Sequence, residues 1–291
     1  GCGLIGSSLL RSIWTKKISK NIFVYEKSKS NISKIKKLKL PCKVINDLRT
    51  IVPKMNMIIF CMPMSEYKKT IIKINNYLNN NILITDVGSS KKETLDLIRS
   101  KLKKNVSWVS SHPITGSEVS GPEFGSKDLF TKKWCILIKE KNTNINNLNK
   151  IKKFWKKIGS KVVTMNSKKH DAIFSITSHL PHLIAYNLVK SAQDFEKKQK
   201  HQIIKYSAGG LRDFSRIAAS NEIMWRDIFF DNRENILKAI NLFTQNLQAF
   251  KKDIKSKNSK TLIKKLIRTK KVRKKIIKLK QDINKPDFGR F

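Results

Sequence analysis

Three segments of this chain concentrate residue types that can bind small anions or move protons. Residues 86–91 read Asp-Val-Gly-Ser-Ser-Lys, residues 111–122 hold His112 among glycines, prolines and serines, and residues 207–220 pair two glycines with two arginines. Loops of this composition are costly to order, which favours a functional role over a bare connection. Because the ordinary pKa of histidine is about 6.5, the imidazole of His112 could act as a base near neutral pH.

Arginine is scarce in this chain, so its placement is informative. Only ten of the 62 basic residues are arginine, and four of these ten fall within 22 residues, at Arg212, Arg216, Arg226 and Arg233. Because nearly all other basic residues of the chain are lysine, this cluster indicates that a planar, forked cation is needed at these positions. Recognition of a carboxylate is the simplest such need.

The first six residues contain the pattern GxGxxG, at Gly1, Gly3 and Gly6. A helix-like segment follows, then the β-type run 21–26, which ends in Glu26, 20 residues after Gly6. Together these features predict a dinucleotide-binding turn, with a pyrophosphate at a helix N-terminus and the Glu26 carboxylate on the adenosine ribose. The strand that should precede this turn is missing from the sequence, so we expect a sheet without its first strand.

The remaining pattern predicts two units. Strands are expected at 21–26, 43–46, 55–62, 81–87, 106–110, 134–139 and 161–166, with helices between several of them, including 7–18, 65–77 and 91–102. This alternation predicts an α/β nucleotide-binding (Rossmann-like) domain over residues 1–167, with a mainly parallel sheet covered on both faces. From His170 to Lys280 the periodicity is helical, which predicts an all-α domain over residues 168–291.

Composition narrows the class of protein. The formal net charge is +41, but the lysines are spread over both halves of the chain, which is atypical of a site for nucleic acid. Residues 251–280 include 15 Lys or Arg and are interpreted as solvated helix. Four cysteines without CxxC spacing and the lack of a long apolar run predict a cytoplasmic protein with no membrane, disulfide framework or zinc cluster.

Ordered motifs along nearly the whole chain resemble the prephenate/arogenate (cyclohexadienyl) dehydrogenase family, in its monofunctional form. The motifs are GCGLIG at 1–6, DVGSSK at 86–91, HPITGSEVSG at 112–121, SHLPH at 178–182, GGLRDFSRIAAS at 209–220, MWRDIF at 224–229 and PDFGR at 286–290. The resemblance implies a nicotinamide cofactor, a helical dimerisation domain that forms a homodimer, and a small-molecule substrate. It also implies oxidative decarboxylation of prephenate, arogenate or both in tyrosine biosynthesis.

The resemblance also assigns roles. His112 would accept the proton of the ring C4 hydroxyl as hydride leaves C4, Ser89 would hydrogen-bond that hydroxyl, and Arg216 would hold a substrate carboxylate. Asp213 and Glu118 would form a network with Arg216. The other residues expected in the substrate pocket are His170, His179, His182, Gly209, Ser220 and Trp225. The residues expected to bind the cofactor are Gly1, Gly3, Leu4, Ile5, Gly6, Glu26, Met62 and Pro63.

Several alternatives stay open. Glu26 favours NAD over NADP, although Lys27 and Lys29 could accommodate a 2′-phosphate. Ser89 could instead cap a helix that begins near residue 91. No metal is expected, because His179 and His182 have no acidic or thiol partners nearby in the sequence.

Two other functions are considered. One is a small hydroxy-acid dehydrogenase, which would usually place a catalytic lysine in the helical region. The other is a basic nucleic-acid-binding protein on a retired enzyme scaffold, against which the intact set of catalytic residue types argues.

Overall fold

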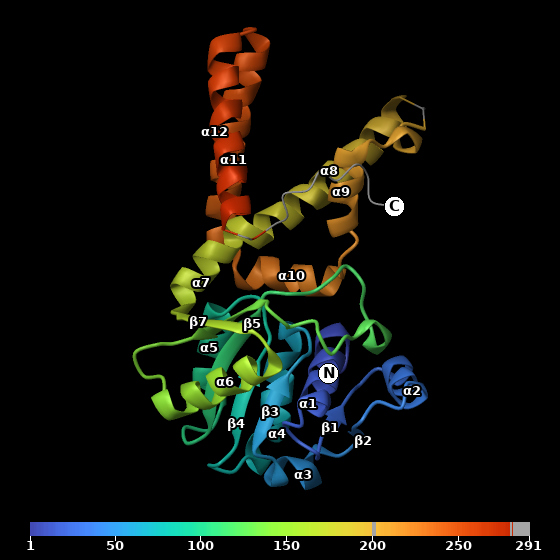
Figure 1. The fold of residues 1–291 in the computed structure, drawn as a ribbon, viewed down its shortest axis with the longest axis vertical. Helices are drawn as coiled ribbons and strands as arrows, with labels where there is room; N and C mark the ends of the chain where they lie inside the picture. Colours follow the sequence, from blue (N-terminus) through green and yellow to red (C-terminus); the bar gives the residue numbers. More distant parts are fainter. Residues whose placement is uncertain (200–201, 280, 282–291) are drawn as a thin grey trace.

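The structure is a computed structural model, and it describes residues 1–199, 202–279 and 281. An α/β unit carries the N-terminal part of the chain, and helices alone form the C-terminal part (Figure 1). The motif at 286–290 lies outside the described residues.

Seven strands form two separate sheets. β1 (Phe23–Tyr25) pairs in parallel with β2 (Lys43–Ile45). The larger sheet has the order β3 (Met57–Phe60), β4 (Leu83–Asp86), β5 (Ser107–Pro113), β6 (Trp134–Ile138) and β7 (Lys161–Met165). All its pairs are parallel except β5 with β6. The prediction of a mainly parallel sheet is therefore confirmed, and each expected strand is present.

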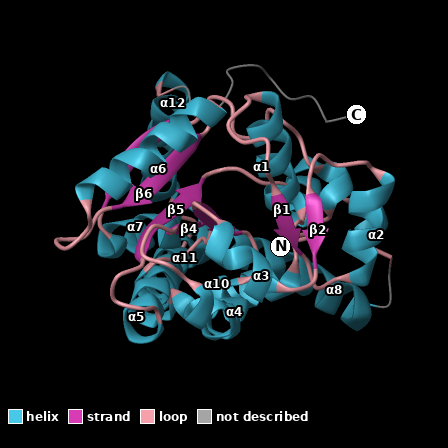
Figure 2. Cartoon of the chain, turned by 90° about the horizontal axis from the view of Figure 1, so that it is seen from below, coloured by secondary structure: helices cyan, strands magenta, loops and turns pink. Residues whose placement is uncertain are grey.

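The start of the chain lies between the two sheets. The Gly1 amine donates to the carbonyl of Tyr25, at the end of β1, over 3.1 Å. On the other side, a Cβ at Gly1 would come within 2.7 Å of the Cys61 carbonyl oxygen, just past β3. Among the described residues no strand joins β1 to β3. Figure 2 shows β1 and β2 beside the N-terminus and apart from β4, β5 and β6.

Helices cover the strands because they present apolar residues on one side. The helices of this unit are α1 (Leu4–Thr15), α2 (Lys29–Lys37), α3 (Leu48–Ile51), α4 (Tyr67–Ile74), α5 (Lys92–Lys101) and α6 (Ile145–Ile158). In α6, Leu148, Ile151, Trp155 and Ile158 recur every three or four residues and are buried against β5 and β6 residues. Burying a side chain of this kind contributes about 1.5–3 kcal/mol, so this face fixes α6 on the sheet.

The C-terminal part is helical, as predicted. Its helices are α7 (Ser167–Phe174), α8 (Leu180–Gln199), α9 (Gly209–Ile217), α10 (Glu222–Asp231), α11 (Arg233–Lys255) and α12 (Ser259–Lys278). A π-helical turn over Ser175–His179 joins α7 to α8, immediately ahead of Pro181. Proline has no N–H to donate, and π turns of this kind recur at functional sites.

α10 lies between the two parts of the molecule (Figure 1). Asp227 of α10 accepts a hydrogen bond of 3.0 Å from the backbone of Ser65, which follows β3. Trp225 and Ile228 of α10 join the core formed by Phe60, Ile71 and Ile84. The helical part is therefore docked on the α/β unit by both polar and apolar contacts.

α11 and α12 form a hairpin that projects from the body (Figure 1). Lys265 of α12 ties it together, with its ammonium 2.6 Å from an Asp253 carboxylate oxygen and 2.9 Å from the Ala249 carbonyl. α12 buries no residue, so the lysine-rich segment is a solvated helix in this chain. No helix in the described part of the chain is long and apolar enough to cross a membrane.

Candidate active site

The site begins at the carboxyl ends of β4 and β5, where a buried ion pair fixes the backbone. The Lys91 ammonium lies 2.6 Å from an Asp86 carboxylate oxygen and 2.7 Å from the Ser111 carbonyl, and the side chains of Lys91 and Asp86 are fully buried. Asp86 also accepts from the Gly88 backbone at 3.0 Å. A buried pair of charges is tolerated only with such additional hydrogen bonds. It holds the turn that carries Ser89 against the residue that precedes His112.

His112 lies within a strand, not in the loop after it. β5 extends to Pro113, and His112 pairs with Ile136 of β6 in the antiparallel ladder. The sequence prediction ended this strand at residue 110, because the Ser-Ser-His-Pro run lacks the apolar character of a typical strand. The backbone of His112 is therefore held by a ladder, which makes its side chain direction more definite than a loop would.

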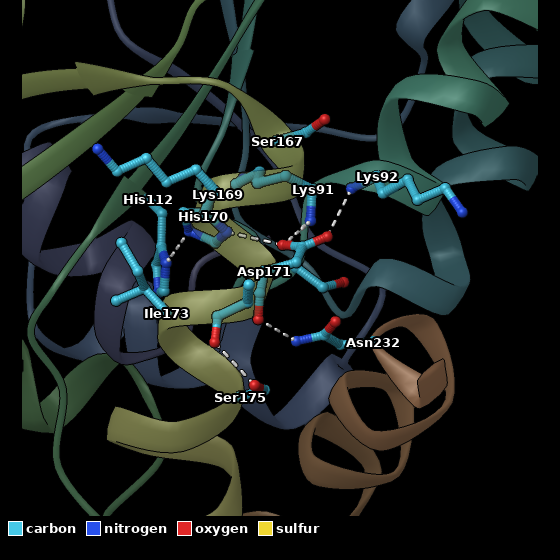
Figure 3. Close-up of polar contacts among 12 residues, drawn as sticks. Lys91, Lys92, His112, Ser167, Lys169, His170, Asp171, Ile173, Ser175 and Asn232 are labelled. Atoms are coloured by element: carbon cyan, nitrogen blue, oxygen red, sulfur yellow. Dashed lines mark hydrogen bonds and ion pairs between the residues drawn. The ribbon is translucent and has the colours of Figure 1, made fainter. Parts of the chain in front are cut away.

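A chain of hydrogen bonds runs behind His112 (Figure 3). Nδ1 of His112 lies 2.8 Å from Nε2 of His170, and Nδ1 of His170 lies 2.7 Å from Oδ1 of Asp171. His170 is fully buried and His112 is 8% exposed, so only His112 reaches solvent. His170 thus stands behind His112, with both ring nitrogens engaged, whereas it was expected in the substrate pocket.

Asp171 connects these hydrogen bonds to the N-terminus of α5. Its Oδ1 accepts from the Lys91 backbone and its Oδ2 from the Lys92 backbone, both at 2.9 Å. These two N–H groups are among those that a helix leaves unpaired at its start. A residue of α7 therefore caps α5, and the alternative that Ser89 caps this helix is wrong, since α5 has no side-chain cap of its own.

The nitrogen that carries the proton in each histidine follows from the Asp171 end of this series of hydrogen bonds. Both oxygens of Asp171 accept backbone N–H groups at a helix N-terminus, so Asp171 meets Nδ1 of His170 as an acceptor. His170 must then donate from Nδ1, and as a neutral ring it accepts at Nε2. His112 must therefore donate from Nδ1, which leaves the lone pair of its Nε2 free to take a proton.

Burial keeps this base neutral. Burial first, and then the proximity of His170, Lys91 and His179, holds the pKa of His112 well below its ordinary value. Burial also lowers the pKa of His170, although its bond to Asp171 opposes that shift. Neutral His112 is the form that can accept a proton, so it is in its working state throughout the physiological pH range.

His179 and Asn232 form a second branch of the same cluster. The Asn232 amide donates to the Asp171 carbonyl at 2.8 Å and lies 3.1 Å from Nδ1 of His179. Nε2 of His179 is buried without a partner, and burial lowers the pKa of His179 to about 4. Asn232 was missed in the sequence, because nothing in its surroundings there distinguishes it from the many other asparagines.

His182 and Trp225 stack on one another. Their ring centroids are 3.8 Å apart with an interplanar angle of 24°, and Nδ1 of His182 donates to the Ser178 carbonyl over 2.9 Å. Nε2 of His182 is left as an acceptor. Trp225 is 5% exposed and belongs to the core, so packing is part of its role.

Arg216 meets the loop that follows His112. Its guanidinium lies 3.6 Å from a Glu118 carboxylate oxygen, and both side chains are partly exposed. Asp213, expected in the same network, is exposed and makes no ion pair within the described chain. Arg226 pairs with Asp227, the next residue of α10, at 2.7 Å. Gly209 opens α9, and the Ser220 carbonyl accepts from the Tyr186 hydroxyl at 2.9 Å.

The glycine turn at the start of the chain fits a pyrophosphate. A Cβ at Gly6 would come within 2.3 Å of the Gly1 carbonyl oxygen, so this turn requires glycine. A Cβ at Gly3 would meet nothing within 4 Å, and no side chain caps α1 there. The first turn of α1, with Leu4 and Ile5, therefore presents free backbone N–H groups to an open space, which suits an anion.

Glu26, the acid that follows the glycine turn in the sequence, is held by backbone groups. Glu26 accepts from the Cys2 N–H at 2.7 Å, the Lys27 N–H at 2.8 Å and the Ser28 N–H at 2.9 Å. Burial raises the pKa of Glu26, but the hydrogen bonds from Ser28 and Cys2 outweigh it, and the net pKa is lowered. Met62 and Pro63 follow β3 on the other side of the turn. Within the described residues, no three His, Cys, Asp or Glu side chains are grouped to hold a metal.

Two family models match consecutive stretches that make up most of this chain. "Prephenate dehydrogenase, nucleotide-binding domain" matches residues 10–164, and "Prephenate dehydrogenase, dimerization domain" matches residues 166–268. The chain belongs to the prephenate dehydrogenase family. Membership confirms the sequence-based resemblance and the Rossmann-like domain followed by a helical one.

Relatives agree with this membership. The chain is 30% identical over 263 residues to a cyclohexadienyl dehydrogenase of Zymomonas mobilis, covering 90% of this chain and 89% of that one. It is 28% identical over 267 residues to a prephenate dehydrogenase of Lactococcus lactis, covering 90% and 72%. It is also similar to the crystal structure of prephenate dehydrogenase from A. aeolicus in complex with hydroxyphenyl propionate and NAD+. That likeness has a TM-score of 0.88 at 31% identity and covers 95% and 96% of the two chains.

Proposed function

We propose that this chain oxidises and decarboxylates prephenate, arogenate or both, with NAD+ as the hydride acceptor, in tyrosine biosynthesis. The observation that carries the proposal is the proton acceptor at Nε2 of His112, backed by His170 and Asp171. A hydroxy-acid dehydrogenase or a nucleic-acid-binding protein does not require this arrangement in a chain that also carries a dinucleotide turn. Membership of the prephenate dehydrogenase family supports the same choice.

His112 accepts and later returns the proton of the C4 hydroxyl. NAD+, held by the glycine turn, would supply the acceptor for the hydride of ring C4. As the hydride leaves, Nε2 of His112 takes the proton of the C4 hydroxyl, which prevents positive charge from developing on that oxygen. The bond from the ring to its carboxylate then breaks, CO2 departs, and the electron pair of that bond completes the aromatic ring. His112 returns the proton to the phenolic oxygen, and Ser89 orients this oxygen throughout.

The residues around His112 fix its ring and disfavour its charge. When Nε2 takes the proton, the imidazolium keeps its Nδ1–H directed at His170, whose other nitrogen is bonded to Asp171. This contact fixes the ring, while burial, His170 and the ammonium of Lys91 all disfavour the cation. These effects keep the cation short-lived and favour return of the proton to the product.

Arg216 binds a substrate carboxylate. The Arg216 to Glu118 contact, at 3.6 Å, is loose and partly exposed, so a substrate carboxylate can replace it at little cost. The forked guanidinium can donate two parallel hydrogen bonds to such a group, which a lysine cannot. His179, with its unpartnered Nε2, and the acceptor on His182 line the same pocket in this proposal, together with Gly209, Ser220, Trp225 and Asp213.

We also propose a cytoplasmic homodimer that is joined through the helical part, and a division between the two domains at residues 167 and 168. The matched "dimerization domain" supports the dimer, as do apolar residues left exposed on the long helices. These residues are Leu188, Phe195, Leu237, Leu242, Phe243, Leu247, Ile263, Leu266 and Ile267. The four cysteines are free, which suits a reducing compartment.

Steady-state assays of NADH formation test this function. We expect turnover of prephenate and arogenate with NAD+, release of one CO2 for each NADH, and weaker turnover with NADP+. NADH formation from a small hydroxy acid, with none from prephenate or arogenate, would refute the proposal in favour of the first alternative. Tight, sequence-selective nucleic-acid binding without any NAD+ binding would favour the second.

A further inference from the structure

The turn after β1 contains the means to bind either nicotinamide cofactor. Enzymes that use NAD place a carboxylate at this point, and those that use NADP place a cation there for the 2′-phosphate. This chain has Glu26 followed directly by Lys27, with Lys29 two residues further on. The net charge of +41 adds a general attraction for the more highly charged NADP. Discrimination against NADP must therefore come from local contacts.

Glu26 is a weakened discriminator. Both of its carboxylate oxygens already accept backbone hydrogen bonds, one from Cys2 and the other from Lys27 and Ser28. These three donors offset part of its negative charge and leave little of it to repel a phosphate. A second negative group near the same turn could therefore add to the discrimination against NADP.

Glu66 is such a group. It ends the short 3-10 turn Met64–Glu66 after β3, and its carboxylate contacts the ammonium of Lys27, 39 residues away in the sequence. The pair thus joins the turns that follow β1 and β3, the strands on either side of the glycine turn. Mutual hydrogen bonding raises the pKa of Lys27 and lowers that of Glu66. The other oxygen of Glu66 lies 3.9 Å from the Lys69 ammonium.

We infer that Glu66 is a specificity-determining residue for NAD, because it engages Lys27 and so withholds the cation that a 2′-phosphate would need. The inference rests on the assignment of a nicotinamide cofactor to the glycine turn. NAD itself does not need Lys27, since its ribose carries a hydroxyl at this position. Loss of the pair should therefore improve NADPH binding and leave NADH binding almost unchanged.

The test measures dissociation constants for NADH and NADPH by the fluorescence of the bound nicotinamide, without substrate or turnover. The variants are Glu66→Gln, Lys27→Met and the two combined. Glu123→Gln is the matched control, because Glu123 pairs with Lys34 and not with Lys27, and its side chain has the same 31% exposure as that of Glu66. Each glutamine removes one negative charge, so the general effect of net charge is equal in the two variants.

In Glu66→Gln the ratio of the NADPH to the NADH dissociation constant should fall about 3- to 10-fold, the range for exchanging one surface ion pair for a phosphate contact. Glu123→Gln should leave the ratio unchanged, and Lys27→Met should cancel the effect of Glu66→Gln. An unchanged ratio in Glu66→Gln would overturn the inference. It would also be overturned if the ratio fell as far in Glu123→Gln, or in the combined variant that lacks Lys27, as it does in Glu66→Gln. Failure of the unsubstituted protein to bind NADH would instead refute the cofactor assignment, and this inference with it.

Discussion

Replacing His112 with asparagine is expected to lower kcat for prephenate oxidation by about 10²- to 10⁴-fold, the usual contribution of a positioned base. Asparagine can still form hydrogen bonds, but it cannot take up the proton of the C4 hydroxyl at Nε2. The measurement is the initial rate of NADH formation at saturating substrate, compared with the unsubstituted enzyme.

Two controls accompany this variant. The dissociation constant of NADH should stay close to that of the unsubstituted protein, because His112 is not among the groups that form the glycine turn, and asparagine can keep a hydrogen bond toward His170, so the fold should be retained. In the unsubstituted enzyme, the acid limb of kcat/KM should fall below pH 6.5, since burial lowers the pKa of His112 and the neutral ring is the active form. Full turnover by the asparagine variant would show that His112 is not the base.

Replacing Arg216 with alanine is expected to raise KM for prephenate about 10²-fold, because a carboxylate loses two charge-assisted hydrogen bonds. Replacement with lysine should recover little of this loss, since an ammonium cannot match both carboxylate oxygens at once. Steady-state kinetics with prephenate as the varied substrate measures both effects.

Arg212 provides the matched control. It lies four residues before Arg216 on the same helix, α9, and is exposed, so its removal changes the charge of the helix by the same amount. Arg212→Ala should change KM less than about threefold, because an exposed cation that makes no direct contact with the substrate contributes little. Equal effects of the two substitutions would show that Arg216 acts through general charge and not through a direct contact.

Local patterns in the sequence were enough to predict the fold. Glycine spacing, short β-type runs and the change to helical periodicity near His170 correspond to α1, the seven strands and the helices from α7 onward. The end of β5 was predicted too early, because Ser111, His112 and Pro113 have little intrinsic preference for a strand. Their strand conformation comes from pairing with β6, which a local pattern cannot reveal.

The supporting residues of the site were harder to predict. Asp171, Lys91 and Asn232 act through hydrogen bonds between elements that are far apart in the sequence. Lys91 belongs to the motif at 86–91 and Asp171 follows His170 directly, but neither position shows which group it will contact. His170 was expected beside the substrate for the same reason, since only the tertiary structure places it behind His112.

The proton relay depends on both parts of the chain. His112 comes from β5 of the α/β unit, whereas His170 and Asp171 come from α7. Asp171 also caps α5, so the contact that joins the two parts is the contact that orients the base. Any separation of the two parts would break the bond between His112 and His170, and with it the control over the position of the proton on His112.

The ¹⁵N NMR spectrum of the histidine rings tests this claim most directly, since the chain has only five histidines and His112→Asn identifies the relevant signals. At neutral pH we predict that His112 carries its proton on Nδ1, with an unprotonated Nε2. We also predict that this preference is lost in Asp171→Asn. A proton on Nε2 of His112 in the unsubstituted protein would contradict the relay and the role of His112 as the base.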